Sequence, residues 1–141
     1  MCAAVAKVKV TRKARFNAAH KLENPSWSAD ENFRVYGQCA NPNFHGHNYE
    51  LEVSVTGAVN PETGYVVDLK YLADLIKSEI EERFDHRNLN LDCPEFLELI
   101  PTAENIAIVI YNLLKPHFPQ PMKLHVRLFE TEHNYVDYPV D

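Results

Sequence analysis

The sequence predicts an α+β fold in which a four-stranded antiparallel sheet carries two helices on one of its faces. Apolar and polar residues alternate over residues 7–19, 45–57 and 122–130, which is the pattern of half-buried strands. Between the second and third of these segments, apolar residues recur at helical spacing in two stretches. Because strands and helices occur in runs rather than in strict alternation, an antiparallel sheet with both helices on one side is favoured.

The composition is that of one ordinary globular domain, which we expect to span residues 1–141. The length is sufficient to bury a core, and the hydrophobic share is 45%. The net charge is −6 and no basic cluster stands out, so we expect no nucleic-acid partner. No apolar run approaches the roughly 20 residues that span a membrane, so we expect no membrane partner.

The chain has three widely spaced cysteines, Cys2, Cys39 and Cys93, and no Cys-x-x-Cys pair. This set argues against a disulfide scaffold or a cysteine-only zinc site, and it favours a reducing compartment, which we take to be cytoplasmic. There is also no Gly-x-Gly-x-x-Gly segment and no P-loop. A dinucleotide-binding or nucleotide-triphosphate-binding fold is therefore not expected.

The first predicted strand is apolar at most even positions from Val8 to Ala18 and polar at the odd ones. His20 continues the even positions, so its side chain should point toward the core. Residues 21–44 contain two prolines and many polar residues, and we expect them to form an irregular loop. A loop of this length in a small domain is more often functional than idle.

The second predicted strand begins with two alternating histidines. His45 and His47 share the face of Val53 and Val55, whereas the intervening positions are mostly polar. Residues 60–64 then read as a turn.

The helical segments have recognisable beginnings. Asp68 is a plausible N-cap for a helix that continues to about Arg83, and Thr102 caps a second helix. Two strands, over residues 122–130 and about 133–138, complete the chain. Four strands leave two open sheet edges, which invites closure by subunit pairing, so we expect an oligomer.

Three histidines form the first candidate site. His20, His45 and His47 all lie on predicted strands, on the apolar side. A single inward histidine is usually a hydrogen-bonded core residue, whereas three on neighbouring strands can hold a metal ion, and the spacing leaves both interpretations open. Imidazole suits zinc, whose catalytic sites use three protein ligands and one open position.

Cys39 and the Asp85–His86 pair form the second candidate site. Cys39 is either a small buried hydrophobe or a base, since a nearby cation lowers the pKa of a thiol. Asp85 can orient the imidazole of His86, or the pair can simply end the preceding helix. Together the three would provide a thiol, a base and an orienting carboxylate for proton abstraction.

Glu130 falls on the apolar side of its predicted strand, where a buried carboxylate needs a partner. The strand has either ended there, leaving Glu130 exposed, or the carboxylate anchors a ligand. A carboxylate accepts two parallel hydrogen bonds from a guanidine-like edge, and pterins and guanines present such an edge. Both interpretations stay open.

With these residues assembled, the chain resembles the 6-pyruvoyl-tetrahydropterin synthase family, of the tunnelling-fold superfamily. The matching segments follow the family's order over nearly the whole length: Arg15–His20, Tyr36–Cys39, His45–Tyr49, Gly64–Leu69, Asp85–Asn90, Pro101–Asn105 and Glu130–Thr131. Several linked motifs at matched separations are specific, although any one alone is weak.

The resemblance implies three groups of functional residues. The zinc ligands would be His20, His45 and His47. The catalytic triad would be Cys39, Asp85 and His86. The substrate-binding residues would be Glu130, which anchors the pterin ring, with Thr102 and Glu104 nearby.

The implied reaction converts 7,8-dihydroneopterin triphosphate to 6-pyruvoyl-tetrahydropterin and releases triphosphate. It is a zinc-dependent carbon–oxygen lyase reaction without a redox cofactor, because the ring is reduced at the expense of the side chain. The family's subunits form trimers that close a β-barrel, two trimers stack into a hexamer, and active sites lie between subunits. The resemblance therefore implies a homohexamer whose triad members can come from different chains.

Two alternatives accompany this hypothesis. The related 6-carboxy-tetrahydropterin synthase of queuosine biosynthesis usually has three residues between the cysteine and the first histidine of the pair. Here five residues, Ala40 to Phe44, separate Cys39 from His45, which favours the pyruvoyl enzyme of tetrahydrobiopterin synthesis. The other alternative is a non-catalytic, zinc-stabilised module that only binds a pterin. Phe44 stands where relatives often have glycine.

Overall fold

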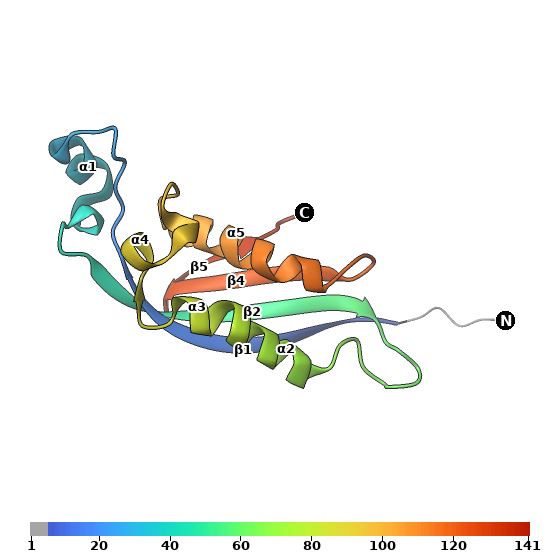
Figure 1. The fold of residues 1–141 in the computed structure, drawn as a ribbon. Coiled ribbons are helices and arrows are strands. Elements are labelled where there is room, and N and C mark those ends of the chain that lie inside the picture. Colours follow the sequence, from blue (N-terminus) through green and yellow to red (C-terminus); the bar gives the residue numbers. More distant parts are fainter. Residues whose placement is uncertain (1–5) are drawn as a thin grey trace.

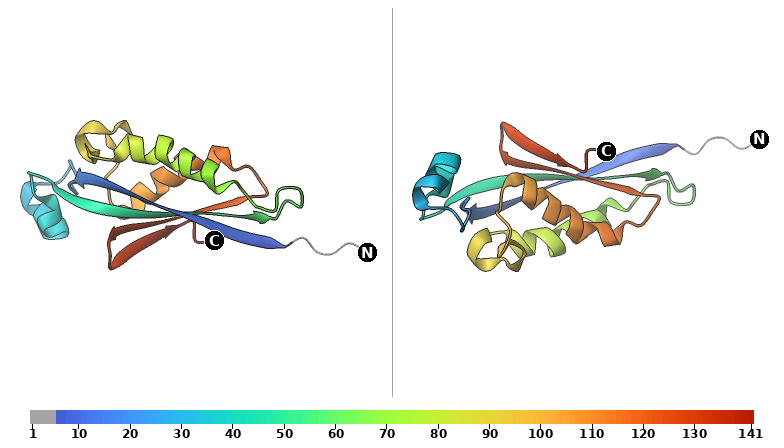
Figure 2. Two further views of the ribbon diagram at one scale, coloured as in Figure 1. Left: turned by 90° about the horizontal axis from the view of Figure 1, so that it is seen from below. Right: turned by 90° about the horizontal axis from the view of Figure 1, so that it is seen from above.

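A computed structural model describes residues 6–141, so Cys2 lies outside the described part of the chain. The sheet is built on two long antiparallel strands, β1 (Lys7–His20) and β2 (His45–Ala58). Two further antiparallel strands, β4 (Lys123–Thr131) and β5 (Asn134–Tyr138), continue it from β2. The main helices cover one face of this sheet (Figures 1 and 2). The predicted α+β fold, with four antiparallel strands and helices on one side, is confirmed.

A fifth strand, β3, consists of only two residues, Arg87–Asn88, and pairs with β1 in parallel. The sheet order is therefore β3-β1-β2-β4-β5. The sequence does not predict β3 because two residues carry no alternation.

The two predicted helices are present with their predicted caps. Helix α2 (Leu69–Ile76) continues through a π-helical turn, Lys77–Glu81, into α3 (Glu82–Phe84). The carboxylate of Asp68 accepts a hydrogen bond from the backbone N–H of Lys70 at 2.9 Å. The short elements are α4 (Leu89–Asp92) and the 3-10 turns Gly37–Ala40, Pro94–Phe96 and Lys115–His117.

Helix α5 (Ala103–Leu114) begins after Thr102, whose hydroxyl accepts from the backbone N–H of Asn105 at 3.2 Å. No helix within residues 6–141 combines the length and the apolar character needed to cross a membrane.

The core lies between the sheet and its helices. Alternate residues of β2 and β4 meet the apolar stripes of α2 and α5, as the periodicity predicts. The central members are fully buried: Leu51, Val53, Val55, Val126, Leu128, Leu72, Ile76, Ile106, Ile110 and Leu114.

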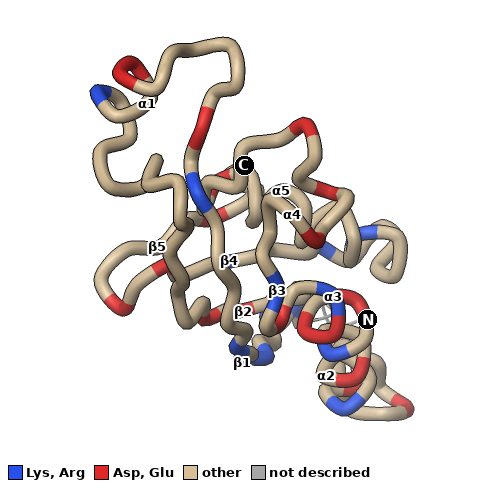
Figure 3. The backbone as a smooth tube through the Cα atoms, turned by 60° about the vertical axis from the view of Figure 1, so that its left-hand side comes forward, with Lys and Arg blue, Asp and Glu red and all other residues tan. Residues whose placement is uncertain are grey.

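The prediction of an irregular loop over residues 21–44 is wrong, because this segment contains helix α1 (Ala29–Tyr36). The hydroxyl of Ser28 accepts from the backbone N–H of Glu31 at 3.1 Å, and Gly37 ends the helix at φ 60°. The helix lies beyond the end of the strands, away from the core (Figure 3). Its buried residue is Asn32, whereas Phe33 is 65% exposed, so this helix does not present the buried apolar stripe on which the prediction of the other helices relied.

Replacing Leu72 with alanine should lower the free energy of unfolding by about 2–5 kcal/mol, because a fully buried side chain leaves a cavity. Leu69 lies on the same helix but is 48% exposed, so Leu69→Ala is the matched control and should cost less than about 0.5 kcal/mol. Urea unfolding followed by circular dichroism, at one protein concentration, measures both. Equal losses would contradict this placement of the core.

Candidate metal centre and pocket

The register of the two central strands brings three histidines together. His20 lies directly opposite His45, and Ala18 lies opposite His47. Because strand side chains alternate, all three imidazoles project from the same face of the sheet. Their ring centroids are 4.6–5.0 Å apart, and one nitrogen from each ring lies within 4.8 Å of the other two. The expected convergence is observed, and one metal ion could contact all three rings.

The imidazole of His20 is held from behind by the backbone. Its Nδ1 lies 2.7 Å from the carbonyl oxygen of Pro101, and a carbonyl can only accept, so Nδ1 carries the proton. The lone pair of Nε2 then faces the other two histidines. Burial lowers the pKa of His20 to about 4, and the hydrogen bond to Pro101 offsets this only in part. Repulsion from the like positive charge of a protonated His45 or His47 lowers the pKa further. The ring therefore stays neutral, which is the form that binds metals.

The cluster leaves several buried nitrogens without a partner. Among the described residues, no hydrogen bond reaches Nε2 of His20, Nε2 of His47 or either ring nitrogen of His45. An unpartnered buried polar atom costs about 1–3 kcal/mol. A metal ion would engage one such nitrogen from each ring, so these residues fit a metal centre better than they fit a hydrogen-bonded core.

Glu130 lies beside this cluster rather than in solvent. Strand β4 continues to Thr131, and the Glu130 side chain is 28% exposed, so the interpretation that the strand has already ended is wrong. One carboxylate oxygen is 3.9 Å from Nε2 of His20, and the other is 3.9 Å from Nε2 of His47. At these distances neither pair forms a hydrogen bond, which leaves the carboxylate available to a ligand.

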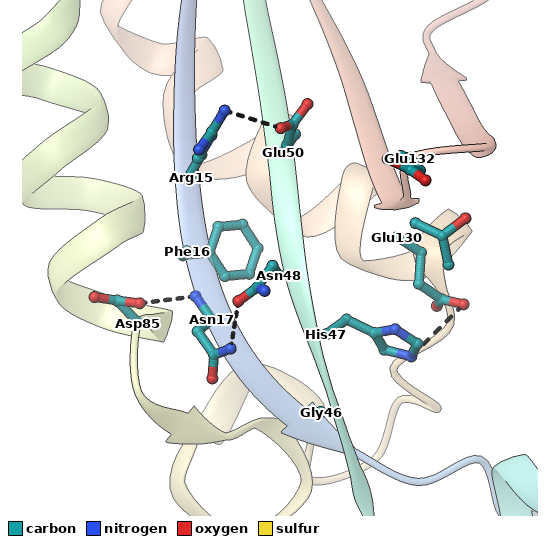
Figure 4. A pocket seen from close by; sticks show the side chains of 11 residues that line it. Arg15, Phe16, Asn17, Gly46, His47, Asn48, Glu50, Asp85, Glu130 and Glu132 are labelled. Atoms are coloured by element: carbon teal, nitrogen blue, oxygen red, sulfur yellow. Dashed lines mark hydrogen bonds and ion pairs between the residues drawn. The ribbon is translucent and has the colours of Figure 1, made fainter.

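A pocket of about 820 Å³ adjoins the cluster. Figure 4 shows His47 and Glu130 pointing toward each other on one side of it, with Asp85 on the other side of β1. Its lining is mostly polar: Arg15, Phe16, Asn17, Gly46, His47, Asn48, Glu50, Asp85, Glu130, Thr131 and Glu132. Its size falls within the usual range for small-molecule sites.

Cys39 lies in the 3-10 turn that follows α1. Its carbonyl oxygen accepts from the backbone N–H of Leu22 at 2.7 Å, which ties the turn to the end of β1. Burial raises the pKa of the thiol, and the negative charge of Glu130 raises it further. The sequence suggested a lowered pKa through a nearby cation, and no such cation acts on the thiol within the described chain.

Asp85 and His86 form a pair on the outer side of β1. Nδ1 of His86 is 2.9 Å from one carboxylate oxygen of Asp85, and the other oxygen accepts from the backbone N–H of Asn17 at 2.7 Å. The bond from Asn17 is the main reason why the pKa of Asp85 is lowered. The His86 side chain is 84% exposed, and within residues 6–141 it makes no hydrogen bond or ion pair with Cys39. One chain thus assembles the pair but not the expected triad.

The remaining expected residues lie at the start of α5. Thr102 caps the helix, and Glu104 is exposed in its first turn. The sequence did not single out Pro101, because its contribution to the site is a backbone carbonyl that carries no side-chain signal.

Comparison with known proteins identifies the family. The family model described as 6-pyruvoyl tetrahydropterin synthase matches residues 9–140. The chain belongs to the 6-pyruvoyl tetrahydropterin synthase family. The resemblance drawn from the sequence motifs is confirmed.

Three relatives show how similar this chain is to known proteins. A 6-pyruvoyl tetrahydrobiopterin synthase of Pongo abelii is 39% identical over 129 residues, covering 92% of this chain and 89% of that protein. The solved structure of the 6-pyruvoyl tetrahydropterin synthase of Caenorhabditis elegans has a TM-score of 0.88 to this chain and is 35% identical to it. The match covers 95% of this chain and 96% of that chain. A 6-carboxy-5,6,7,8-tetrahydropterin synthase of Rickettsia bellii is 28% identical over 148 residues, covering 92% of this chain and 99% of that protein.

Phe44 lies where the resemblance to the family led us to expect glycine, and its backbone conformation is uncommon for a residue other than glycine. Its φ is 67°, in the left-handed region that glycine adopts at little cost. The ring lies 5.2 Å from Nζ of Lys21, a cation–π contact that offsets part of the strain.

Replacing His47 with alanine should weaken the binding of a metal ion, tested with zinc, by more than about a hundredfold, since the loss of an outer-shell partner alone typically costs about 10–100-fold. Competition against a chromophoric chelator measures the dissociation constant. His125→Ala is the control, because His125 lies on β4 and pairs with Asp137 at 3.3 Å, outside the cluster. Equal affinities in the two variants would contradict a histidine metal centre.

Proposed function

We propose that this chain is a zinc-dependent lyase that converts 7,8-dihydroneopterin triphosphate to 6-pyruvoyl-tetrahydropterin and releases triphosphate. The observation that carries the proposal is the cluster of three histidines whose buried nitrogens lack partners, beside Glu130, in a member of this family. The 39% identity to a protein named 6-pyruvoyl tetrahydrobiopterin synthase supports this product, and we take the enzyme to be cytoplasmic.

His20, His45 and His47 would hold the zinc ion. When bound, the ion supplies a Lewis acid that acidifies the C–H and O–H groups of the substrate side chain. The Pro101 carbonyl keeps His20 in the tautomer that presents Nε2, so this ligand needs no rearrangement before binding.

Glu130 would anchor the pterin. Its two carboxylate oxygens can accept the two parallel N–H groups of the guanidine-like edge of the ring. Since each oxygen lies 3.9 Å from a histidine Nε2, a ring bound there would place its side chain beside the metal ligands. Thr102 and Glu104, at the start of α5, would lie nearby.

Cys39 would act as the base that removes a proton from the substrate side chain, assisted by His86 and oriented by Asp85. Asp85 holds the Nδ1 edge of His86, which leaves Nε2 of that ring available for proton transfer. Because the pair does not contact Cys39 within one chain, a second copy would supply it. The proposed assembly is the homohexamer, in which the open edges of the sheet are closed by neighbouring subunits.

Two other functions are possible for the same fold. A 6-carboxy-tetrahydropterin synthase would use the same groups and then cleave a carbon–carbon bond. This function is less well supported than the pyruvoyl enzyme, because five residues separate Cys39 from His45 and because the identity to the Rickettsia enzyme is only 28%. A zinc-stabilised binding module would need a closed metal site, with Cys39 as a fourth ligand.

Zinc-loaded protein incubated with 7,8-dihydroneopterin triphosphate should yield 6-pyruvoyl-tetrahydropterin and triphosphate, both identified by mass spectrometry. The metal-free protein is the control and should give neither product. A carboxy product accompanied by acetaldehyde would instead support the queuosine enzyme. Absence of turnover by folded, zinc-loaded protein would contradict both activities.

Replacing Cys39 with alanine should reduce kcat by at least about a hundredfold, because general acid–base catalysis typically contributes about 10²–10⁴-fold. Zinc content and oligomeric state should stay as in the wild type, as measured by elemental analysis and light scattering. Cys93→Ala is the control: this thiol lies in the core, so stability falls while kcat is retained. Loss of zinc in Cys39→Ala would favour the binding module.

A further inference from the structure

The peptide group between Pro101 and Thr102 has both of its polar atoms engaged. Its carbonyl oxygen accepts from Nδ1 of His20 at 2.7 Å, and its N–H donates to the carbonyl oxygen of Ile100 at 2.8 Å. In a trans peptide the N–H and the C=O point in opposite directions. The bond to Ile100 therefore aims the Pro101 carbonyl at His20.

Asn105 fixes the acceptor on which this orientation depends. Its side-chain Nδ2 donates to the Ile100 oxygen at 2.9 Å, and its backbone N–H donates to the hydroxyl of Thr102 at 3.2 Å. The Ile100 oxygen is thus held by two donors, from Thr102 and from Asn105. The peptide group cannot rotate away from His20 without disturbing these bonds.

His20 has few other means of orientation. Its side chain is 1% exposed, so water does not reach it freely, and the hydroxyl of Tyr49 lies at the longer distance of 3.4 Å from Nδ1. The Pro101 carbonyl is therefore the principal acceptor that sets the tautomer and the plane of this ring.

We propose that Asn105 is a positioning residue for the metal centre. Within the described residues it forms no hydrogen bond to a histidine, and it acts through the backbone. Asn105 holds the Ile100 carbonyl, the Ile100 carbonyl aims the Pro101 carbonyl, and the Pro101 carbonyl presents Nε2 of His20 to the metal. This inference rests on the metal site of the proposed function and not on its substrate.

The test replaces Asn105 with aspartate, which has the same shape but sets a carboxylate oxygen against the Ile100 carbonyl. The zinc dissociation constant should rise by about 10–100-fold, the usual effect of losing an outer-shell partner. The visible absorption of cobalt-loaded protein should also change, because His20 is held less firmly. A carboxylate is favourable near a helix N-terminus, so weaker metal binding would not follow from a weaker helix.

The matched control is Asn112→Asp, which makes the same chemical change at an exposed position of the same helix. It should leave the zinc dissociation constant and the cobalt spectrum unchanged. If Asn105→Asp does not fold, Asn105→Ser is titrated instead, and a weaker zinc affinity than that of the wild type is again expected.

A merely structural role for Asn105 would lower the melting temperature of the metal-free protein and leave both metal readouts of the folded variant as in the wild type. That result would overturn the inference. Wild-type protein that binds neither zinc nor cobalt would overturn the metal site itself. The wild-type titration therefore distinguishes failure of the proposed function from failure of the positioning role.

Discussion

The pairing register of β1 and β2 is the constraint on which the rest of the structure depends. It runs from Lys7 opposite Ala58 to His20 opposite His45, without interruption. Because side chains alternate between the faces, a shift of one residue would turn the apolar set toward solvent and separate the histidines. The same register therefore decides which residues face the core and which histidines come together.

Periodicity in the sequence was enough to predict the sheet, its two main helices and the shared face of His20, His45 and His47. Periodicity failed for α1, which buries Asn32 rather than an apolar stripe, although Ser28 and Gly37 mark the ends of that helix. Contributions of the backbone could not be predicted either. The Pro101 carbonyl reaches His20 across 81 positions of the chain, and no side-chain pattern encodes that contact.

The start of α5 combines functions that are usually separate. Residues 101–105 cap a helix whose apolar side belongs to the core, they hold a histidine of the proposed metal centre, and they include Thr102 and Glu104, to which the proposed function assigns a place beside the pterin. The helix is anchored by buried residues such as Ile106 and Ile110, so its first turn is presented from a rigid support. Rigid support of this kind is what allows ligands to be held in a productive geometry before anything binds.

The backbone N–H of Leu22 donates a hydrogen bond to the Cys39 carbonyl at 2.7 Å. The chain between these two residues is therefore a closed loop beyond the end of the strands. Residues 23–38 can therefore lengthen or shorten without displacing the thiol or the strands. Closing a longer loop is inexpensive, since each doubling of its length costs only about 0.6 kcal/mol. Evolution can thus remodel this segment independently of the histidines and the carboxylate that the sheet holds in place.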